Sequence, residues 1–419
     1  MKRAVLLLGA TFFLSALISC SNNNNSVTGP NGNVTVNAPS MLKNRAFITN
    51  QYSGNVQIMD TQNDTTAYYQ VTNNNTGVTG PGVTGTAVNI AIGGSLTFEV
   101  LSPNDSETLV YNPNNFTVSF ITNSTETSAG AVTLANWAPM AVYSPDSSKV
   151  YVPVPLAPIT NGQAGGVQVI DTTNIAITST YPVPSANSVA ISPDGKTLLV
   201  FARNSDTMYL IDLTATTPTA VAIPGFAAPV NAFFSSDSST AYVINCGPEC
   251  GSKAGPPSVM RFDRSSLSIT ATVPVGGARV GLMQNNNLYV AGYPGGSTGT
   301  FDVVEVSSMT RSTTNPVVIG DGTHTIMSIS NNNKMYVGAV TCANTSVGCL
   351  SIVDLGTMTA APMGSPLGGV TGLQSIPKRN TMYTIQGGVL YIYDTTTGQL
   401  QSTQVSFRGA LYAVVQVDP

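Results

Sequence analysis

The chain of 419 residues has little charge: Asp, Glu, Lys and Arg make up 9% of it, against about a quarter in ordinary globular proteins. Its 16 basic residues form no cluster and are outnumbered by 20 acidic ones. Binding to nucleic acid depends on grouped Lys and Arg side chains that neutralise phosphates. The composition therefore argues against nucleic acid as a partner.

Residues and motifs for catalysis are also scarce. Histidine and tryptophan occur once each, as His324 and Trp137. The sequence contains no Gly-x-Ser-x-Gly elbow, Walker loop, dinucleotide fingerprint or EF-hand loop. One His and five Cys at spacings that fit no zinc pattern predict neither a metal site nor a cofactor. We predict no catalytic residue and favour a non-enzymatic role.

Helical periodicity is hard to find after residue 20, and 39 Gly and 26 Pro punctuate the chain. Short runs rich in Val, Ile and Tyr lie between turn residues instead. This pattern is typical of an all-β protein.

The apolar stretch from Ala4 to Ile18 follows Lys2 and Arg3 and is too short to span a bilayer comfortably, so it is interpreted as the core of a signal peptide. A small residue, Ser19, then precedes Cys20. This arrangement resembles the lipobox of bacterial lipoproteins. The resemblance implies a signal peptide over residues 1–19, cleavage after Ser19 and a lipid on Cys20. The alternative is an ordinary secretory signal with an incidental cysteine.

Residues 21–40, SNNNNSVTGPNGNVTVNAPS, contain too few apolar side chains to order themselves. We therefore predict a flexible tether over residues 20–40, with a reach of roughly 25 Å. By resemblance to the sorting rule of enteric lipoproteins, Ser21 in place of Asp implies the outer membrane. The expected location is the cell envelope, with the lipid anchor in the outer membrane if the organism is Gram-negative.

The other four cysteines occur as two close pairs. Cys246 and Cys250 lie in CGPEC, and Cys342 and Cys349 lie in CANTSVGC. In an exported protein such pairs favour disulfides, each within one loop. A metal site built from the four thiols is the alternative.

One pattern repeats along the chain. Residues 188–213, SVAISPDGKTLLVFARNSDTMYLIDL, contain an apolar strand, a Pro-Asp-Gly turn, a second strand, a polar loop and a third strand that ends at Asp212. Similar units end at Asp171, Asp263, Asp354 and Asp394. The spacing of the units, about 40 to 58 residues, is that of a propeller blade. Because these carboxylates recur at strand ends, we interpret them as turn or capping residues.

The two ends of the chain predict how the ring closes. The segment 44–60 begins at the second strand of a unit, whereas 410–419 resembles a first strand alone. The C-terminal strand should therefore pair into the N-terminal blade, which leaves no open sheet edge. We predict a single domain over 41–419 with eight four-stranded blades, or seven if the weak unit near Phe98 merges with a neighbour. The expected first strands lie near Phe98, Val142, Val189, Phe233, Leu282, Met327, Leu373 and Val414.

The units resemble the YVTN family of β-propeller repeats. The matching residues are the Ser-Pro-Asp-Gly-Lys turn at 192–196 and the strand ends at 169–172 and 210–212. The resemblance covers nearly everything from residue 44 onward and implies a propeller. It does not specify a function, because propellers serve many roles.

The loops that precede first strands, or join second to third strands, should emerge on one face. The candidate ligand face on these loops consists of Trp137, Arg203, Asp206, Arg279, His324 and Arg408. The alternative is that these residues are scattered polar groups that solvate a rim.

The predicted function is a monomeric envelope lipoprotein that binds a protein or glycan partner through the loop face and contacts the membrane through its lipid. One version is an assembly factor, by analogy with the eight-bladed propeller lipoprotein of the outer-membrane barrel machinery. The alternatives are a hydrolase of the propeller lactonase type and a structural surface-layer protein.

Overall fold

The computed structural model of the chain describes residues 26–29, 32–37, 40, 42–66, 70–73, 79–81, 89–158, 164–294, 298–312, 316–342, 347–361, 366–376, 378–401 and 410–418. Regular structure in these ranges is β-strand, apart from one 3-10 helix, η1 (Gly247–Cys250). No helix in the same ranges is long and apolar enough to cross a membrane. The predicted all-β class is confirmed.

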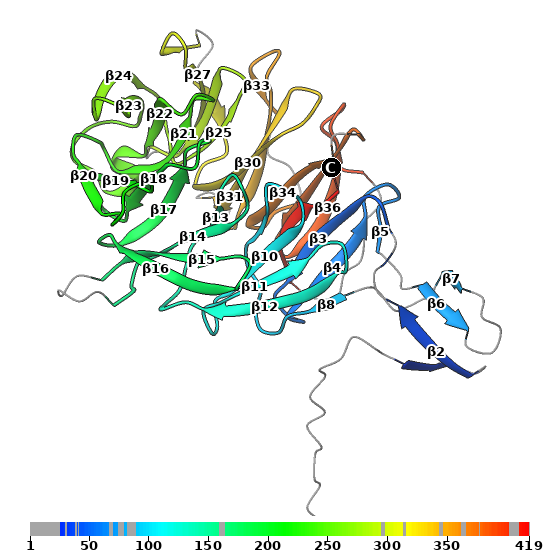
Figure 1. The fold of residues 1–419 in the computed structure, drawn as a ribbon. Helices are drawn as coiled ribbons and strands as arrows, with labels where there is room; N and C mark the ends of the chain where they lie inside the picture. Colours follow the sequence, from blue (N-terminus) through cyan, green and yellow to red (C-terminus); the bar gives the residue numbers. More distant parts are fainter. Residues whose placement is uncertain are drawn as a thin grey trace, which may run out of the picture.

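Eight antiparallel sheets form the blades of a ring (Figure 1), which confirms the predicted eight-bladed propeller. Blades 2 to 5 each contain four strands in chain order. Their strands are β9 (Glu99–Leu101), β10 (Glu107–Asn112), β11 (Thr117–Thr122) and β12 (Thr127–Thr133); β13 (Val142–Tyr143), β14 (Lys149–Val154), β15 (Gly166–Asp171) and β16 (Ala176–Pro182); β17 (Ala186–Ile191), β18 (Thr197–Ala202), β19 (Met208–Asp212) and β20 (Ala220–Ile223); β21 (Pro229–Phe234), β22 (Thr240–Asn245), β23 (Ser258–Asp263) and β24 (Ser268–Pro274). The unit near Phe98 thus forms a blade of its own.

Blades 6 to 8 have short or divided outer strands. Their strands are β25 (Val280–Gln284), β26 (Asn287–Gly292), β27 (Gly299–Glu305), β28 (Thr310–Arg311) and β29 (Val317–Ile319); β30 (Thr323–Ile329), β31 (Lys334–Thr341), β32 (Cys349–Asp354) and β33 (Thr359–Ala360); β34 (Val370–Ile376), β35 (Thr381–Gln386) and β36 (Val389–Asp394). Both β28 and β29 pair with β27. In blade 8, a single bridge between Tyr393 and Leu400 stands in place of a longer fourth strand.

Blade 1 is built from both ends of the ring. Its strands are β37 (Leu411–Gln416), β3 (Arg45–Asn50) and β4 (Asn55–Asp60), with β5 (Thr65–Thr66) and β8 (Asn89–Ala91) on the outer edge. Strand β37 pairs antiparallel with β3, with Val414 opposite Ile48. The predicted closure by the C-terminal strand is confirmed.

Apolar clusters between neighbouring blades form the core. Strand β18, for example, is buried along its whole length, because the middle strands of a blade face another blade on each side. This explains the continuous apolar runs of these strands, which differ from the alternating pattern of a sheet with one solvent-exposed face. Leu210 and Phe201 of blade 4 pack with Val243 and Phe262 of blade 5 in one such cluster.

The repeated turn residues act as local hydrogen-bonding devices. The Ser192 hydroxyl donates to Asp194, and that carboxylate accepts the backbone N–H of Lys196 at 3.1 Å. The strand-end carboxylates act in the same way, since Asp171 and Asp263 each accept a backbone N–H three residues onward at 2.8 Å. Their interpretation as turn residues is confirmed.

Arginine ion pairs hold blade 1 to both of its neighbours. Arg45 pairs with Glu126 of blade 2 at 2.8 Å and with Asp418, which follows β37, at 2.7 Å. On the other side, Arg379 of blade 8 pairs with Asp64 at 2.5 Å. We call Arg45, Glu126 and Asp418 the closure network.

A separate sheet lies outside the ring. It contains β1 (Ser26–Gly29), β2 (Gly32–Asn37), β6 (Gln70–Asn73) and β7 (Thr79–Pro81). Figure 1 shows β2, β6 and β7 apart from the blades. The sequence reasoning expected an unstructured tether over 20–40 and did not anticipate β1 and β2. Cys20 lies outside the described residues.

Candidate functional site

A cavity of about 630 Å³ opens at one end of the ring, where the first strands of blades 4, 5 and 7 begin. Its wall comes from blades 3 to 7 and includes backbone and side chains on both sides of the ring axis. We call it the mouth cavity. Ligand-sized cavities in proteins are about 300–1,000 Å³, so this one can hold a small molecule or the end of a larger one.

Arg203 reaches the mouth cavity from the end of β18. Its backbone N–H donates to the Ser185 carbonyl at 3.0 Å, which fixes the point where the strand ends. Arg203 is exposed, and its guanidinium carbon lies 5.8 Å from the centroid of the Trp137 ring. This arrangement is typical of a cation–π contact. No carboxylate among the described residues forms an ion pair with Arg203. The positive charge is therefore oriented but not neutralised.

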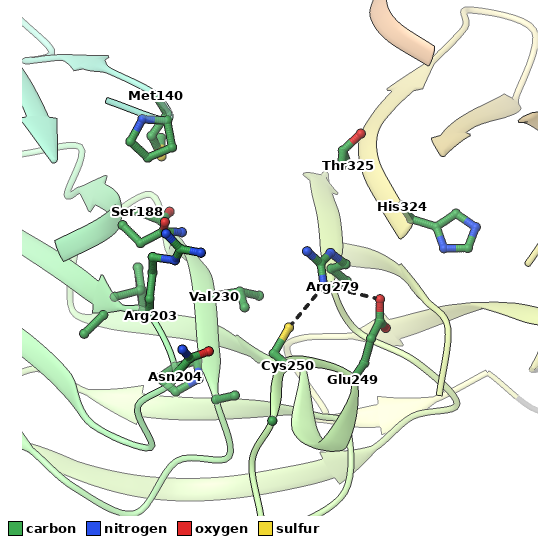
Figure 2. Close-up of a pocket in the computed structure, with 17 residues that line it drawn as sticks. Met140, Ser188, Arg203, Asn204, Val230, Glu249, Cys250, Arg279, His324 and Thr325 are labelled. Atoms are coloured by element: carbon green, nitrogen blue, oxygen red, sulfur yellow. Dashed lines mark hydrogen bonds and ion pairs between the residues drawn. The ribbon is translucent and has the colours of Figure 1, made fainter. Parts of the chain in front are cut away.

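Arg279 approaches from the loop before β25. Its backbone N–H donates to the Ala291 carbonyl at 2.8 Å, and its Nη1 lies 3.6 Å from Oε1 of Glu249 and 3.5 Å from Sγ of Cys250. Figure 2 shows both arginines, Arg203 and Arg279, pointing toward the space between them.

Glu249 is the one acidic residue in the wall of the mouth cavity. Burial raises the pKa of its carboxyl, and the backbone N–H of Tyr293, at 2.7 Å, and the Arg279 charge oppose that rise. With two arginines against one carboxylate, the cavity carries a net positive charge in a chain whose net charge is −4.

His324 lines the mouth cavity at the start of β30, but its imidazole points away from it (Figure 2). The residue is 1% exposed. Burial lowers the pKa of the ring to about 4, against a raising contribution from the Gly320 carbonyl. Neither ring nitrogen has a partner at hydrogen-bonding geometry among the described residues. The ring is therefore a neutral, enclosed group near neutral pH.

The other predicted ligand-face residues have different places. Trp137 supports Arg203, as described above. The Asp206 carboxylate accepts the Ala228 N–H at 2.9 Å and the Ser252 hydroxyl at 2.6 Å, so it joins two loops of the cavity wall. Arg408 lies outside the described residues. Three of the six candidates, Arg203, Arg279 and His324, thus line one cavity.

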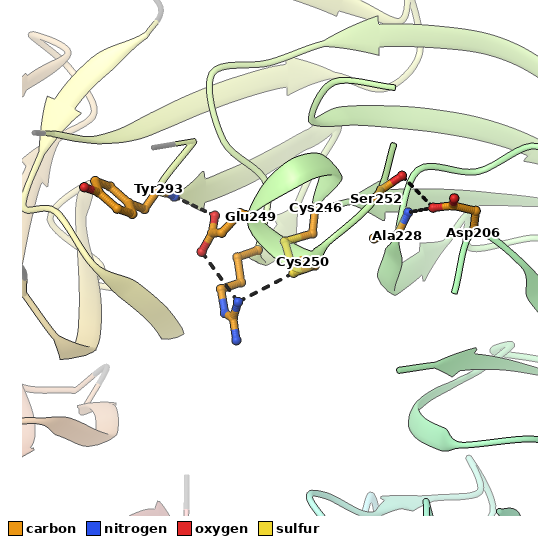
Figure 3. Close-up of a disulfide and its surroundings, with 8 residues drawn as sticks. Asp206, Ala228, Cys246, Glu249, Cys250, Ser252 and Tyr293 are labelled. Atoms are coloured by element: carbon orange, nitrogen blue, oxygen red, sulfur yellow. Dashed lines mark hydrogen bonds and ion pairs between the residues drawn. A yellow bond between two sulfur atoms is a disulfide. The ribbon is translucent and has the colours of Figure 1, made fainter. Parts of the chain in front are cut away.

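The two predicted disulfides are confirmed. Cys246 bonds to Cys250 and Cys342 bonds to Cys349. Figure 3 shows the first of them beside Glu249. No group of three or more His, Cys, Asp or Glu side chains able to hold a metal occurs in the described part of the chain.

The sequence reasoning missed Glu249 and the apolar wall formed by Met140, Phe201 and Val230. The sequence could have indicated Glu249 as a site residue, because it lies between two paired cysteines in a loop that joins a second strand to a third. The apolar wall residues had none, since each belongs to a run that reads as ordinary blade core.

Comparison with known proteins shows the fold only. No protein-family model matches the chain, and no curated protein matches it. Among solved structures, the dihydro-heme d1 dehydrogenase NirN in complex with DHE shares 12% identity at a TM-score of 0.67, over 91% of this chain and 76% of that one. A functionally unknown protein from Desulfotomaculum acetoxidans shares 16% at 0.53, over 78% and 98%. The Cps50 (Swd1) propeller domain of Myceliophteria thermophila shares 9% at 0.52, over 70% and 93%.

Proposed function

We propose that this chain is a non-enzymatic binding protein of the cell envelope whose mouth cavity takes an anionic group. The observation that carries the proposal is the pair of guanidinium groups, Arg203 and Arg279, that face one cavity in a chain with few charges and a net negative charge. The anionic group belongs to an envelope protein or glycan, as an acidic side chain or a sugar carboxylate.

Binding follows from the chemistry of the wall. Guanidinium groups donate paired hydrogen bonds to carboxylates and phosphates in a fixed geometry. Trp137 holds Arg203 in place before a ligand arrives, which reduces the entropy lost on binding. The apolar side chains of Met140 and Val230 provide a surface for the uncharged part of the ligand.

The hydrolase alternative has less support. A lactonase-type reaction in this cavity would need an acid–base group that reaches the substrate. The His324 imidazole is enclosed and turned away from the cavity, and Glu249 is occupied by Arg279 and the Tyr293 N–H. Lactone hydrolysis that is lost in Glu249→Gln would favour the hydrolase over the binding protein.

The binding proposal is tested by titrating the full chain with sulfate, acetate, succinate and glucuronate in a calorimeter. At least one of them should bind, and Arg203→Gln and Arg279→Gln should each weaken it by about tenfold or more, because a hydrogen bond to a charged group contributes about 1.5–3 kcal/mol. Arg264→Gln, which removes an arginine between blades 4 and 5, is the control. Equal losses in all three variants, or no binding of any probe, would contradict the proposal.

We also propose that the mature protein begins at a lipidated Cys20. The basis is the sequence pattern of residues 2–20 alone. Mass spectrometry of the N-terminal peptide should show diacylglycerol on Cys20, and Cys20→Ala should move the protein from the membrane to the soluble fraction. An unmodified Cys20 in the membrane-bound protein would contradict it.

A further inference from the structure

The two disulfides differ in how accessible they are. Cys342 and Cys349 are 1% and 2% exposed and pack together with Ala339. In the other pair Cys246 is fully buried, whereas Cys250 is partly exposed and forms part of the wall of the mouth cavity. A thiolate from solvent can therefore approach one sulfur of one disulfide.

The surroundings of Cys250 also favour exchange. The guanidinium of Arg279 lies 3.5 Å from its Sγ (Figure 2). A neighbouring cation stabilises a cysteine as the thiolate, the form that leaves and attacks in disulfide exchange. The competing anion, Glu249, is slightly farther from Arg279, at 3.6 Å.

The loop that carries this disulfide is held in place by other bonds. The N–H groups of Cys246 and Gly247 donate to the carbonyls of Ala228 and Ala227, each at 2.9 Å. At the other end, the Ser252 hydroxyl donates to Asp206 at 2.6 Å. A disulfide with a sequence separation of 4 also closes only a very short loop, so its contribution to the entropy of the unfolded chain is small. Reduction should therefore leave the loop in place.

We propose that Cys246–Cys250 is a thiol–disulfide exchange site for a dithiol partner, a function separate from anion binding. A thiolate of the partner attacks Sγ of Cys250, the Cys246–Cys250 bond breaks, and Cys246 leaves as a thiolate that takes up a proton. The second thiolate of the partner then attacks its own sulfur in the mixed disulfide and releases Cys250 as a thiolate beside Arg279. The partner is oxidised to a disulfide and this chain is reduced by two electrons. The reverse sequence reduces a disulfide partner when this chain starts as the dithiol.

The first experiment compares the two disulfides in the native protein. The full chain is incubated with dithiothreitol, quenched with iodoacetamide at successive times and mapped by mass spectrometry. Cys246 and Cys250 should become alkylated at least tenfold faster than Cys342 and Cys349. Equal rates, or reduction of Cys246–Cys250 only in denaturant, would overturn the proposal.

A second experiment identifies the attacked sulfur and the role of Arg279. In the Cys246→Ala variant, Cys250 should react with iodoacetamide at a lower pH than an ordinary cysteine. Adding Arg279→Gln should shift that profile to higher pH, whereas adding Arg264→Gln should not. A Cys250 that titrates like a free cysteine in both backgrounds would overturn the proposal. So would a glutathione adduct found on Cys246 instead of Cys250 in the otherwise unaltered chain.

Discussion

The closure network and the mouth cavity use the same side chain in opposite ways. At the closure, the Arg45 side chain is 9% exposed and contacts two carboxylates and the Asn123 carbonyl, which lies 2.6 Å from its Nη1. At the mouth, Arg279 is 34% exposed with one carboxylate at 3.6 Å, and Arg203 lies against an aromatic ring and forms no ion pair with a described carboxylate.

The difference distinguishes an arginine that stabilises the fold from arginines that can bind a ligand. A buried ion is tolerated only when partners compensate for the water it has lost, and Arg45 has such partners from two segments of the chain, the β11–β12 turn and Asp418. The guanidinium groups of Arg203 and Arg279 at the mouth remain partly hydrated, and their N–H groups can donate to a ligand. Such donors contribute little to stability, because exposed pairs contribute about 0–1 kcal/mol, but they are available to an incoming anion.

The largest effect should come from breaking the closure network. Arg45→Met leaves the carboxylate of Glu126, whose side chain is 1% exposed, buried without its counterion, with the hydrogen bonds from the Ser40 N–H and hydroxyl still in place. We expect a loss of about 3–5 kcal/mol in unfolding free energy, measured with urea. Arg203→Gln should change the same quantity by less than about 0.5 kcal/mol, because it is a surface substitution. A larger loss for Arg203→Gln than for Arg45→Met would refute the distinction.

An intermediate effect is expected from Glu249→Gln. The amide keeps an acceptor for the Tyr293 N–H but removes the negative charge that competes for Arg279. Affinity for an anion such as sulfate should rise about three- to tenfold, which corresponds to about 1 kcal/mol. Calorimetry would show it, and unchanged or weaker binding would mean that the carboxylate does not compete for Arg279.

The same residue predicts a pH dependence. Burial raises the pKa of Glu249 in the folded protein, so the folded state holds this proton more tightly than the unfolded chain. Its contribution to stability is then present at low pH and is lost as pH rises through the raised pKa. Sulfate should bind more tightly at about pH 5 than at about pH 8, and Glu249→Gln should remove that difference. His324 stays neutral throughout, because its pKa is about 4.

A small effect on stability should come from Arg264→Ala. Partial burial raises the pKa of Asp194, but hydrogen bonds from Ser192, the Lys196 N–H and Arg264 outweigh it and hold the pKa at about 2. The stabilisation is present above the unfolded pKa of about 3.8 and is lost as pH falls toward 2. Removal of Arg264 should lower the unfolding free energy by about 0.2–1 kcal/mol near neutral pH. It should also raise the pH at which the stabilisation from Asp194 is lost on acidification. An effect as large as that of Arg45→Met would contradict the ranking.

The fold could be predicted because it rests on local signals repeated eight times. The turn at 192–196 and the strand ends at Asp171 and Asp263 reappear in the structure as hydrogen-bonded turns. The end pattern predicted the pairing of β37 with β3. The outer sheet escaped prediction because β1 and β2, which pair with each other, lie in a segment rich in Asn and Gly with few apolar side chains. The pairing of β2 with the distant β6 leaves no short-range mark in that segment.

The site was only partly predictable. Loop position on a known fold placed Arg203, Arg279 and His324 at one end of the ring. It could not show that the His324 ring turns inward, since that depends on packing around one side chain. Nor could it show that Asp206 holds two loops together, because a carboxylate in a polar loop looks the same whether it faces a ligand or a backbone N–H.

The closing strand also sets an order of events during synthesis. Arg45 and Asp418, which meet at 2.7 Å, are 373 residues apart in the chain, and β37 is made after every other strand of the ring. The chain is synthesised at about 5–20 residues per second, so one edge of β3 stays unpaired for on the order of tens of seconds. During this time blades 2 to 8 can form from neighbouring segments. An unpaired edge is a template for aggregation. The nascent protein is therefore most vulnerable at the blade that, once complete, is tied by arginines to both of its neighbours.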